Sequence, residues 1–294
     1  MPTLAERLGF EASDRVAIVH ADDVGMCHAA NVGAFEALAH GPATCGSIMV
    51  PCPWFPEAAA HARAHPELDL GVHLTLNAEW PHYRWGPVAG RQAVPSLLDD
   101  EGFLPRTSLE TVQRAKPEEV EVELRAQIEA ALAAGIDVTH VDSHMGTCFF
   151  PDFVGIYVRL AVEYRLPAFA VRPSAAAVER NAIVAKVAEV VADAESKGVP
   201  ILDLFDADSL GFAEGEGPEH NRERIAGLGP GLNYLICHPA KGGEELDHVC
   251  PEHAHQRDFE RSFYGGEAGR EALAAAGVKT LGMRPLRDLM RGEA

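Results

Sequence analysis

The sequence predicts an α/β protein whose single domain is an irregular, TIM-barrel-like (β/α) barrel of seven to eight parallel strands. Short β-rich runs alternate with helical patterns along all 294 residues, and repeated βα units favour a parallel sheet. Eight strand candidates in a chain of this length fit a barrel better than an open sheet. No internal repeat or domain boundary is visible, so residues 1–294 are expected to form one domain.

The first βα units are predicted from short apolar runs. A strand is predicted at 16–19, and it leads into two adjacent aspartates. A helix follows at 29–39, where Val32, Phe35 and Leu38 recur at helical spacing. Gly41-Pro42 ends this helix. Two further strands are expected at 47–50 and 68–76.

The second half of the chain continues the alternation. A long amphipathic helix begins at Pro117, carries acidic residues in its first turn, and ends before Gly135. Its apolar face repeats every four residues, at Val120, Leu124 and Ile128. The later strands are expected at 137–141, 168–171, 201–205, 232–237 and 278–281, with helices at 153–164 and 182–196 between them.

The stretch 77–116 interrupts this rhythm and is predicted to be an insertion. It is too long for an ordinary connection, and it is rich in Pro, Gly and aromatic residues. We therefore expect a lid or a substrate-binding loop. Trp80, Tyr83 and Trp85 are suited to stacking against a sugar ring, and the alternative is simple packing within the insertion.

Composition excludes several classes of function. The formal net charge of −19 disfavours nucleic-acid and anionic-membrane partners, because both need basic surfaces. No apolar run approaches the length of a membrane span, and no signal peptide is visible. The six cysteines form no CxxC pair, which indicates free thiols and a cytoplasmic protein. A small molecule or an oligosaccharide is the expected partner, and a homodimer remains open.

Unusual polar residues gather where the predicted strands end. In a parallel barrel those ends share the face on which active sites lie. An Asp-Asp pair follows the first strand, one histidine lies in the third, a His-x-Asp-x-His motif ends the fourth, and another histidine follows the seventh. These residues are Asp22, Asp23, His73, His140, Asp142, His144 and His238.

Each of these residues also has a structural explanation. Asp22 and Asp23 are compatible with a turn and a helix cap, and His73 with a buried, hydrogen-bonded core histidine. His140 is suited to bracing a neighbour, and Asp142 to orienting a ligand. Other candidates lie farther from the motifs. Arg172 is suited to holding substrate oxygens or to a structural ion pair. The histidines between 248 and 255 are expected in a solvated loop.

Together the motifs favour metal chemistry. Aspartate and histidine are ligands for a divalent ion, and three of them leave coordination positions for water and substrate. A second aspartate beside a ligand is placed to take a proton from water, and a histidine across the site to return one to a leaving group. The expected cofactor is one divalent ion. Zn²⁺ and Mg²⁺ are the first choices, and Mn²⁺, Co²⁺ and Ni²⁺ remain open.

Four ordered motifs and the C-terminal segment resemble one known family. Residues 21–25 read ADDVG, residues 71–76 read GVHLTL, residues 139–144 read THVDSH, and residues 237–239 read CHP. Residues 277–289, ending in RPLRDL, are similar to the family's closing segment. This pattern resembles the YdjC/ChbG-like carbohydrate deacetylases and covers nearly the whole chain.

The resemblance implies metal-dependent removal of acetyl groups from N-acetylated amino sugars by an irregular (β/α) barrel. Carried over by position, it implies Asp23, His73 and His144 as metal ligands, Asp22 as general base and His238 as general acid. We expect His238 to keep a proton near neutral pH for this role. Two alternatives remain, namely a deacylase of a non-sugar N-acyl compound and a carbohydrate-binding protein that has lost turnover.

Overall fold

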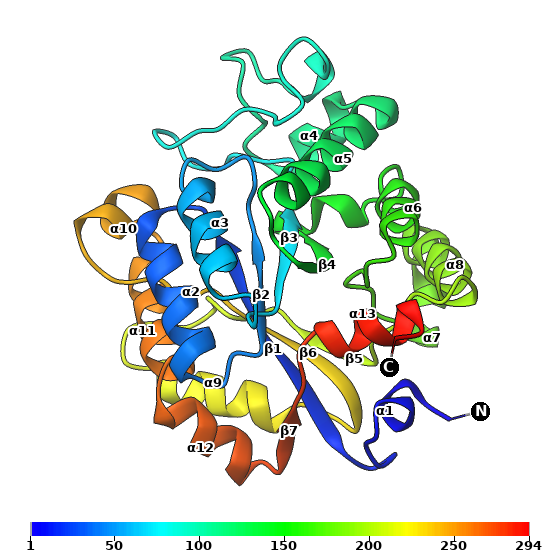
Figure 1. Ribbon diagram of the computed structural model, residues 1–294, viewed down its shortest axis with the longest axis vertical. Coiled ribbons are helices and arrows are strands. Elements are labelled where there is room, and N and C mark those ends of the chain that lie inside the picture. The colour runs from blue at the N-terminus through cyan, green and yellow to red at the C-terminus, as the bar shows by residue number, and fades with distance from the viewer. Residues whose placement is uncertain (1, 294) are drawn as a thin grey trace.

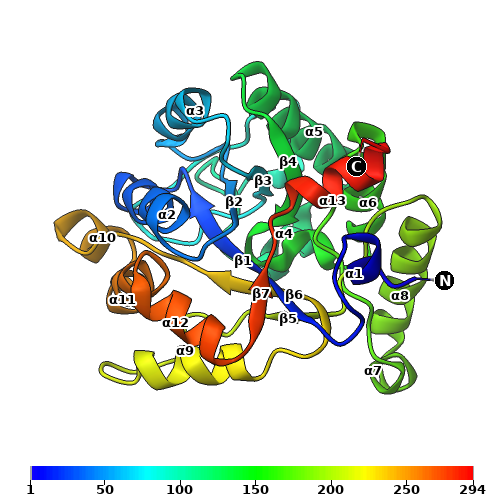
Figure 2. The ribbon, with the colours of Figure 1, turned by 60° about the horizontal axis from the view of Figure 1, so that its bottom comes forward.

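The computed structural model describes residues 2–293, without the side chains of residues 182 and 183. Parallel strands form the centre of the molecule, and helices surround them (Figures 1 and 2). The strands are β1 (Arg15–Val24), β2 (Cys45–Ile48), β3 (Leu70–Leu74), β4 (Val138–Ser143), β5 (Leu204–Asp206), β6 (Gly231–Cys237) and β7 (Val278–Thr280).

Most helices follow a strand and pack on the outside of the sheet. They are α1 (Leu4–Arg7), α2 (His28–His40), α3 (Phe55–Ala64), α4 (Ser108–Arg114), α5 (Pro117–Ala133), α6 (Val154–Tyr164), α7 (Ala175–Arg180), α8 (Ala182–Ser196), α9 (Gly217–Ala226), α10 (Glu244–Val249), α11 (Ala254–Tyr264), α12 (Glu267–Ala275) and α13 (Arg284–Arg291). Two 3₁₀ helices, η1 (Pro95–Leu97) and η2 (His144–Phe149), complete the set. No helix in the described part of the chain is long and apolar enough to cross a bilayer.

The strand order is that of a barrel whose ladder is not closed. The strands run β4-β3-β2-β1-β6-β5, all parallel, and β7 pairs with β1. Between β4 and β5 only two isolated bridges remain, Val141 with Ala168 and Val171 with Leu202. The predicted barrel-like fold is thus confirmed, with a gap on one side that α6 and α8 cover (Figure 1).

Two predicted strands differ in the structure. The segment 168–171 forms only those bridges, and the strand expected at 201–205 pairs with β6 only from Leu204 to Asp206. Prolines flank both segments, at 167, 173 and 200. Because proline cannot donate a backbone hydrogen bond, a continuous ladder cannot form through these positions.

The apolar core has an outer and an inner part. The outer part lies between the sheet and its helices, where residues such as Val19, Ile128 and Leu160 are fully buried. The inner part lies inside the barrel, and the C-terminal Met283 and Leu286 close its lower end. This packing leaves the opposite end, where β1, β3, β4 and β6 finish, available for polar side chains.

The insertion at 77–116 packs on the rest of the molecule. Glu123 of α5 accepts the backbone N–H groups of Val88 and Ala89, both at 2.9 Å. Trp85 is buried, and its indole N–H donates to the Asn77 carbonyl at 2.8 Å. Trp80, Tyr83 and Trp85 also contact one another. These aromatic residues therefore pack within the insertion, and its role as a lid stays a prediction.

Candidate active site

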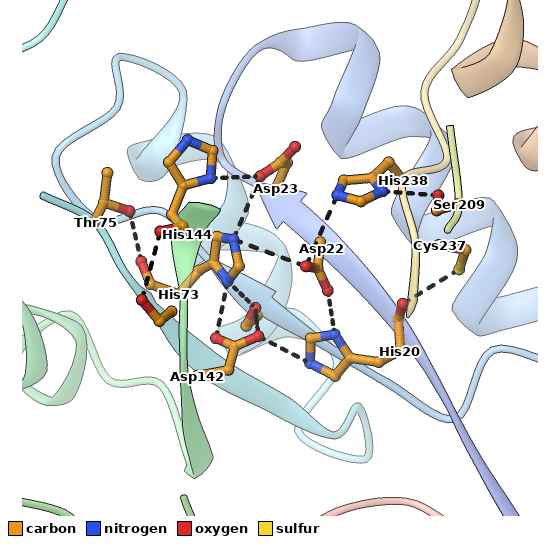
Figure 3. Close-up of polar contacts among 12 residues, drawn as sticks. His20, Asp22, Asp23, His73, Thr75, Asp142, His144, Ser209, Cys237 and His238 are labelled. Carbon is orange, nitrogen blue, oxygen red and sulfur yellow. Dashed lines mark hydrogen bonds and ion pairs between the residues drawn. The ribbon is translucent and has the colours of Figure 1, made fainter. Parts of the chain in front are cut away.

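The predicted site residues meet at the carboxyl ends of the strands (Figure 3). Asp22 and Asp23 lie near the end of β1, and His73 lies in β3. His144 directly follows β4, and His238 directly follows β6. The structure therefore brings together five side chains from four separate segments of the sequence.

A local distortion of β1 turns its two aspartates in different directions. The pairing of β1 with β2 shifts between Ala21 and Val24, and Asp23 has a left-handed φ of 63°. Asp23 consequently approaches His73 and His144, while Asp22 faces His20 and His238 (Figure 3). In a regular strand, consecutive side chains point to opposite faces, and Asp23 would point away from the face of Asp22. The distortion therefore allows both aspartates to reach the same site.

Asp23, His73 and His144 form a compact, buried group that could hold a metal ion, and we call it the candidate ligand set. The Asp23 Oδ1 atom lies 3.2 Å from His144 Nδ1 and 3.5 Å from His73 Nε2. One ligand atom from each residue lies within 4.8 Å of the others. No group in the described residues makes a well-directed hydrogen bond to either carboxylate oxygen of Asp23, whose contacts are ion pairs with the two imidazoles and with an arginine. A buried carboxylate beside two imidazole nitrogens fits a divalent ion well.

Arg257 supplies positive charge behind this set. Its Nη2 atom lies 2.8 Å from Asp23 Oδ2, and both side chains are buried. Burial alone would raise the pKa of Asp23, but Arg257 and the two histidines hold it well below its usual value. Arg257 belongs to α11, and we did not predict its role. It lies just after the histidines between 248 and 255, which are exposed as expected but lie mostly at the end of α10 and the start of α11 and not in a long loop. Nothing in the local sequence distinguishes it from a surface arginine.

Asp142 orients His73. Its Oδ1 atom lies 2.9 Å from His73 Nδ1, and its Oδ2 atom accepts a hydrogen bond from Ser47 at 2.9 Å. Nε2 of His73 is thereby directed toward Asp23. Burial would lower the pKa of His73, but the neighbouring aspartates raise it well above 6.5. The structure thus places Asp142 where it fixes the orientation of a ligand.

Glu79 plays a similar part for His144. Its carboxylate oxygens lie 3.1 Å from His144 Nε2, which leaves Nδ1 facing Asp23. Burial would lower the pKa of His144, but Glu79 and Asp23 raise it to about 9. Glu79 comes from the insertion, so this segment contributes directly to the candidate site. Sequence reasoning missed it because it singled out only the aromatic residues there.

Asp22 lies between the ligand set and His238. Its Oδ1 atom is 2.5 Å from His20 Nδ1, and its Oδ2 atom is 3.9 Å from His73 Nε2 and 3.8 Å from His238 Nε2. We did not predict His20. It precedes Asp22 by two residues in the same strand, and this spacing was the signal that places both on one face.

A hydrogen-bond chain fixes the ring of His238. Its Nδ1 atom lies 2.8 Å from Ser209 Oγ, and Ser209 donates to Glu260 at 2.7 Å. Because that hydroxyl proton is engaged, Oγ accepts from Nδ1–H, which leaves Nε2 unprotonated and facing Asp22. Burial lowers the pKa of His238 to about 4. This differs from our expectation that the ring keeps a second proton at neutral pH.

His140 braces the site from inside the barrel. Its Nε2 atom lies 2.8 Å from His20 Nε2, and its Nδ1 atom lies 2.9 Å from Thr139 Oγ1. The ring sits over Gly71, where a Cβ atom would approach it to 2.6 Å, so only glycine fits there. Burial and His20 lower the pKa of His140 to about 3. This imidazole is therefore neutral.

Arg172 does not join these residues. Its guanidinium pairs with Glu195 at 2.6 Å, and it lines a different cavity. Of its two predicted roles, the structure shows the ion pair. The cavity beside Asp22 and His238, which we call the candidate catalytic cavity, has a volume of about 330 Å³. Asp142 and Ser143 also border it, together with several apolar residues, namely Met145, Phe149, Phe169, Phe205, Tyr234 and Ile236.

The fold and the site define a class of protein, a (β/α) barrel with a buried carboxylate–imidazole set and an adjacent aspartate and histidine at its strand ends. The family model described as YdjC-like protein matches residues 16–275. The chain therefore belongs to the YdjC-like family, as its motifs predict.

Several relatives agree with this membership. A carbohydrate deacetylase of Geobacillus stearothermophilus is 31% identical over 77% of this chain and 80% of its own length. A carbohydrate deacetylase of Thermus thermophilus is 40% identical over 55% of this chain. The matched region spans just over half the length of that relative, 56%. A solved Enterococcus faecalis structure, assigned to cellobiose-phosphate cleavage, has a TM-score of 0.76, with 25% identity over 93% of this chain and 99% of its own.

Proposed function

We propose that this protein is a metal-dependent amide hydrolase that removes the acetyl group from an N-acetylated amino sugar or oligosaccharide. The observation that carries the proposal is the position of Asp22 and His238, which border one cavity and lie beside the buried Asp23–His73–His144 set. The naming of several relatives as carbohydrate deacetylases supports the same reaction. A binding protein without turnover would need neither an acid nor a base.

The residues divide into binding and proton-transfer roles. Asp23, His73 and His144 would hold the divalent ion, with Zn²⁺ or Mg²⁺ as first choice. When bound, such an ion polarises an amide carbonyl and lowers the pKa of water. Asp142 and Glu79 hold the two imidazoles in the orientation that presents a nitrogen to the site. Arg257 keeps Asp23 ionised and thus able to act as a ligand.

Asp22 and His238 carry the proton from water to the leaving amine. Asp22 takes the proton as water attacks the carbonyl carbon, and His20 holds its carboxylate in place. His238 is neutral at rest, so the proton it donates must arrive during the reaction. Asp22 Oδ2 and His238 Nε2 lie 3.8 Å apart, so a water molecule or the leaving nitrogen in front of them can contact both and pass the proton on. Protonation of the amine then allows the C–N bond to break.

The proposed function is tested by measuring acetate release from several substrates with the wild-type protein and with one variant. Purified protein, stripped of metal and reloaded with single divalent ions, is assayed for acetate release from N-acetylglucosamine and its oligomers. We expect release that depends on the added metal and is lost in Asp22→Asn. No release from any N-acetyl sugar with any of the metals would contradict the proposal. Release from N-acyl amino acids alone would favour the non-sugar alternative, which the apolar walls of the catalytic cavity make a real competitor.

A further inference from the structure

A second cavity adjoins the catalytic one. It has a volume of about 530 Å³, which is within the range of ligand sites. Phe149, Phe169 and Phe205 line both cavities, so these three rings lie at their common boundary. The second cavity lies at the gap between β4 and β5, where the barrel ladder is open, and α6, α7 and α8 form its outer wall.

The walls of this second cavity are hydrocarbon. Beyond the shared aromatic rings they are formed mainly by small aliphatic side chains, namely Val154, Val158, Ala177, Val184, Val187 and Val191. Both charged lining residues have partners elsewhere. Arg172 pairs with Glu195, and Asp203 accepts the backbone N–H of Leu232 at 2.8 Å. A sugar ring placed here would lose hydrogen bonds to water without replacing them. A hydrocarbon group would lose none.

The entrance to this cavity exposes apolar surface. The side chains of Leu204 and Phe205 are 46% and 55% exposed, although they belong to a strand of the central sheet. Phe205 borders both cavities and Leu204 borders the second one. Exposed apolar surface that continues into a cavity is typical of a binding site for an apolar ligand.

We propose that the second cavity binds a hydrocarbon group of the substrate, which makes the substrate an amphipathic N-acyl amino sugar. This inference rests on the proposed function for the reacting amide and adds the chemistry of the neighbouring group. The amide carbon would lie in the catalytic cavity beside Asp22 and His238. The hydrocarbon would pass the three shared rings into the second cavity. It is attached either as an acyl chain longer than acetyl or through the glycosidic oxygen, and the experiment separates these two sources.

The first experiment varies the hydrocarbon at each position. One series carries acetyl, butyryl, hexanoyl and octanoyl groups on glucosamine, and the other carries methyl, butyl and octyl groups as glycosides of N-acetylglucosamine. Burial of a methylene group is worth about a fourfold gain. We therefore expect kcat/KM to rise at least roughly tenfold along one series. The series that responds identifies the attachment. Hydrolysis of the short members with no rise in kcat/KM along either series overturns the proposal.

The second experiment fills the cavity. Ala177→Trp places an indole in the second cavity from α7. Ala176→Trp is the matched control, because Ala176 is its exposed neighbour in the same helix and does not line the cavity. We expect Ala177→Trp to reduce the ratio of long-chain to short-chain kcat/KM at least roughly tenfold, and Ala176→Trp to leave it unchanged. An equal ratio in both variants contradicts the proposal.

A binding measurement separates this inference from the proposed reaction. Calorimetry with N-octanoylglucosamine and octyl N-acetylglucosaminide is performed on wild type, Ala177→Trp and Ala176→Trp. If no substrate is hydrolysed, the proposed reaction fails. The cavity assignment still stands if either ligand binds more weakly only to Ala177→Trp. Absence of binding of both ligands to wild type, or equal affinity in all three proteins, overturns the cavity assignment whatever the activity.

Discussion

At the residue scale, the division of labour between the two adjacent aspartates can be tested directly. Asp23 lies against both ligand histidines, and Asp22 lies between His20 and His238. We expect His73→Ala and His144→Ala to lose nearly all bound metal. Asp22→Asn should keep the metal and lose kcat by about 10²-fold or more, because only proton transfer is removed. Metal analysis and kinetics on the same preparations check both expectations.

The opposite result for the two aspartates would exchange the roles assigned to Asp22 and Asp23. Loss of metal in Asp22→Asn, with retention in Asp23→Asn, would make Asp22 the ligand. Full metal occupancy in both histidine variants would contradict the ligand assignment. His238→Ala serves as a further control, because it should keep the metal and impair amides more than activated esters, whose leaving groups need no proton.

His140 gives the molecule a specific sensitivity to acid. Its pKa is about 3 in the folded protein and about 6.5 when unfolded, so the unfolded chain binds more protons below pH 6.5. The contribution of His140 to stability is therefore full above pH 6.5 and is lost as the pH falls toward 3. The total is on the order of 4 kcal/mol.

The matched variant is His140→Gln, which keeps hydrogen-bonding groups but does not titrate. We expect its melting temperature to fall less than that of wild type between pH 7 and pH 4. Thermal unfolding in a chelator avoids the separate effect of metal release at low pH. If the difference in melting temperature between wild type and His140→Gln were the same at pH 7 and at pH 4, the pKa assigned to His140 would be wrong.

At the scale of elements, α5 holds the insertion through one buried carboxylate. Glu123 is fully buried and accepts hydrogen bonds from two backbone N–H groups of the insertion and from Gln127. Glu123→Ala leaves these donors unpaired, which costs roughly 1–3 kcal/mol for each buried group. We expect faster amide hydrogen exchange at Val88 and Ala89 and a raised KM, because Glu79 belongs to the same segment.

Glu118→Ala is the control for this prediction, since Glu118 is exposed in the first turn of the same helix. This variant should change neither the amide hydrogen exchange of Val88 and Ala89 nor the KM. If Glu123→Ala loosens the insertion while KM and substrate preference remain unchanged, the segment has no part in substrate recognition, and its predicted role as a lid is wrong.

At the scale of the whole molecule, the C-terminal helix closes the end of the barrel opposite the site. Arg287 of α13 bonds to Asp137 at 2.5 Å and to the Val138 carbonyl at 3.1 Å, just before and at the start of β4. Arg287→Ala removes a charge-assisted pair between a buried arginine and a half-exposed aspartate, and it leaves the buried Val138 carbonyl without this donor. We expect the free energy of unfolding to fall by about 1.5–3 kcal/mol, with unchanged metal content.

Denaturant unfolding measures this effect. Arg291→Ala is the comparison, because the guanidinium of Arg291 contacts only an exposed backbone carbonyl in the described structure. We expect its free energy of unfolding to change by no more than about 1 kcal/mol. A loss of bound metal in Arg287→Ala would show that the two ends of the barrel are coupled, contrary to this prediction.

The sequence by itself determined the barrel-like class and the family, and it led to the site residues Asp22, Asp23, His73, His144 and His238. Strand ends are visible as apolar runs followed by polar residues, and parallel strands bring those ends to one face. An apolar run and the polar residues that follow it are neighbours in the chain, so they can be recognised from the sequence without a structure.

Only the tertiary structure decided which residues support the site and where the barrel opens. Glu79, Arg257 and Glu260 act on residues 65, 234 and 22 positions away, respectively. No local pattern encodes such pairs, because their contacts arise only when distant segments pack together. The open side between β4 and β5 has the same origin: apolar runs at 168–171 and 201–205 read as strands, but backbone pairing depends on neighbours that the sequence does not specify.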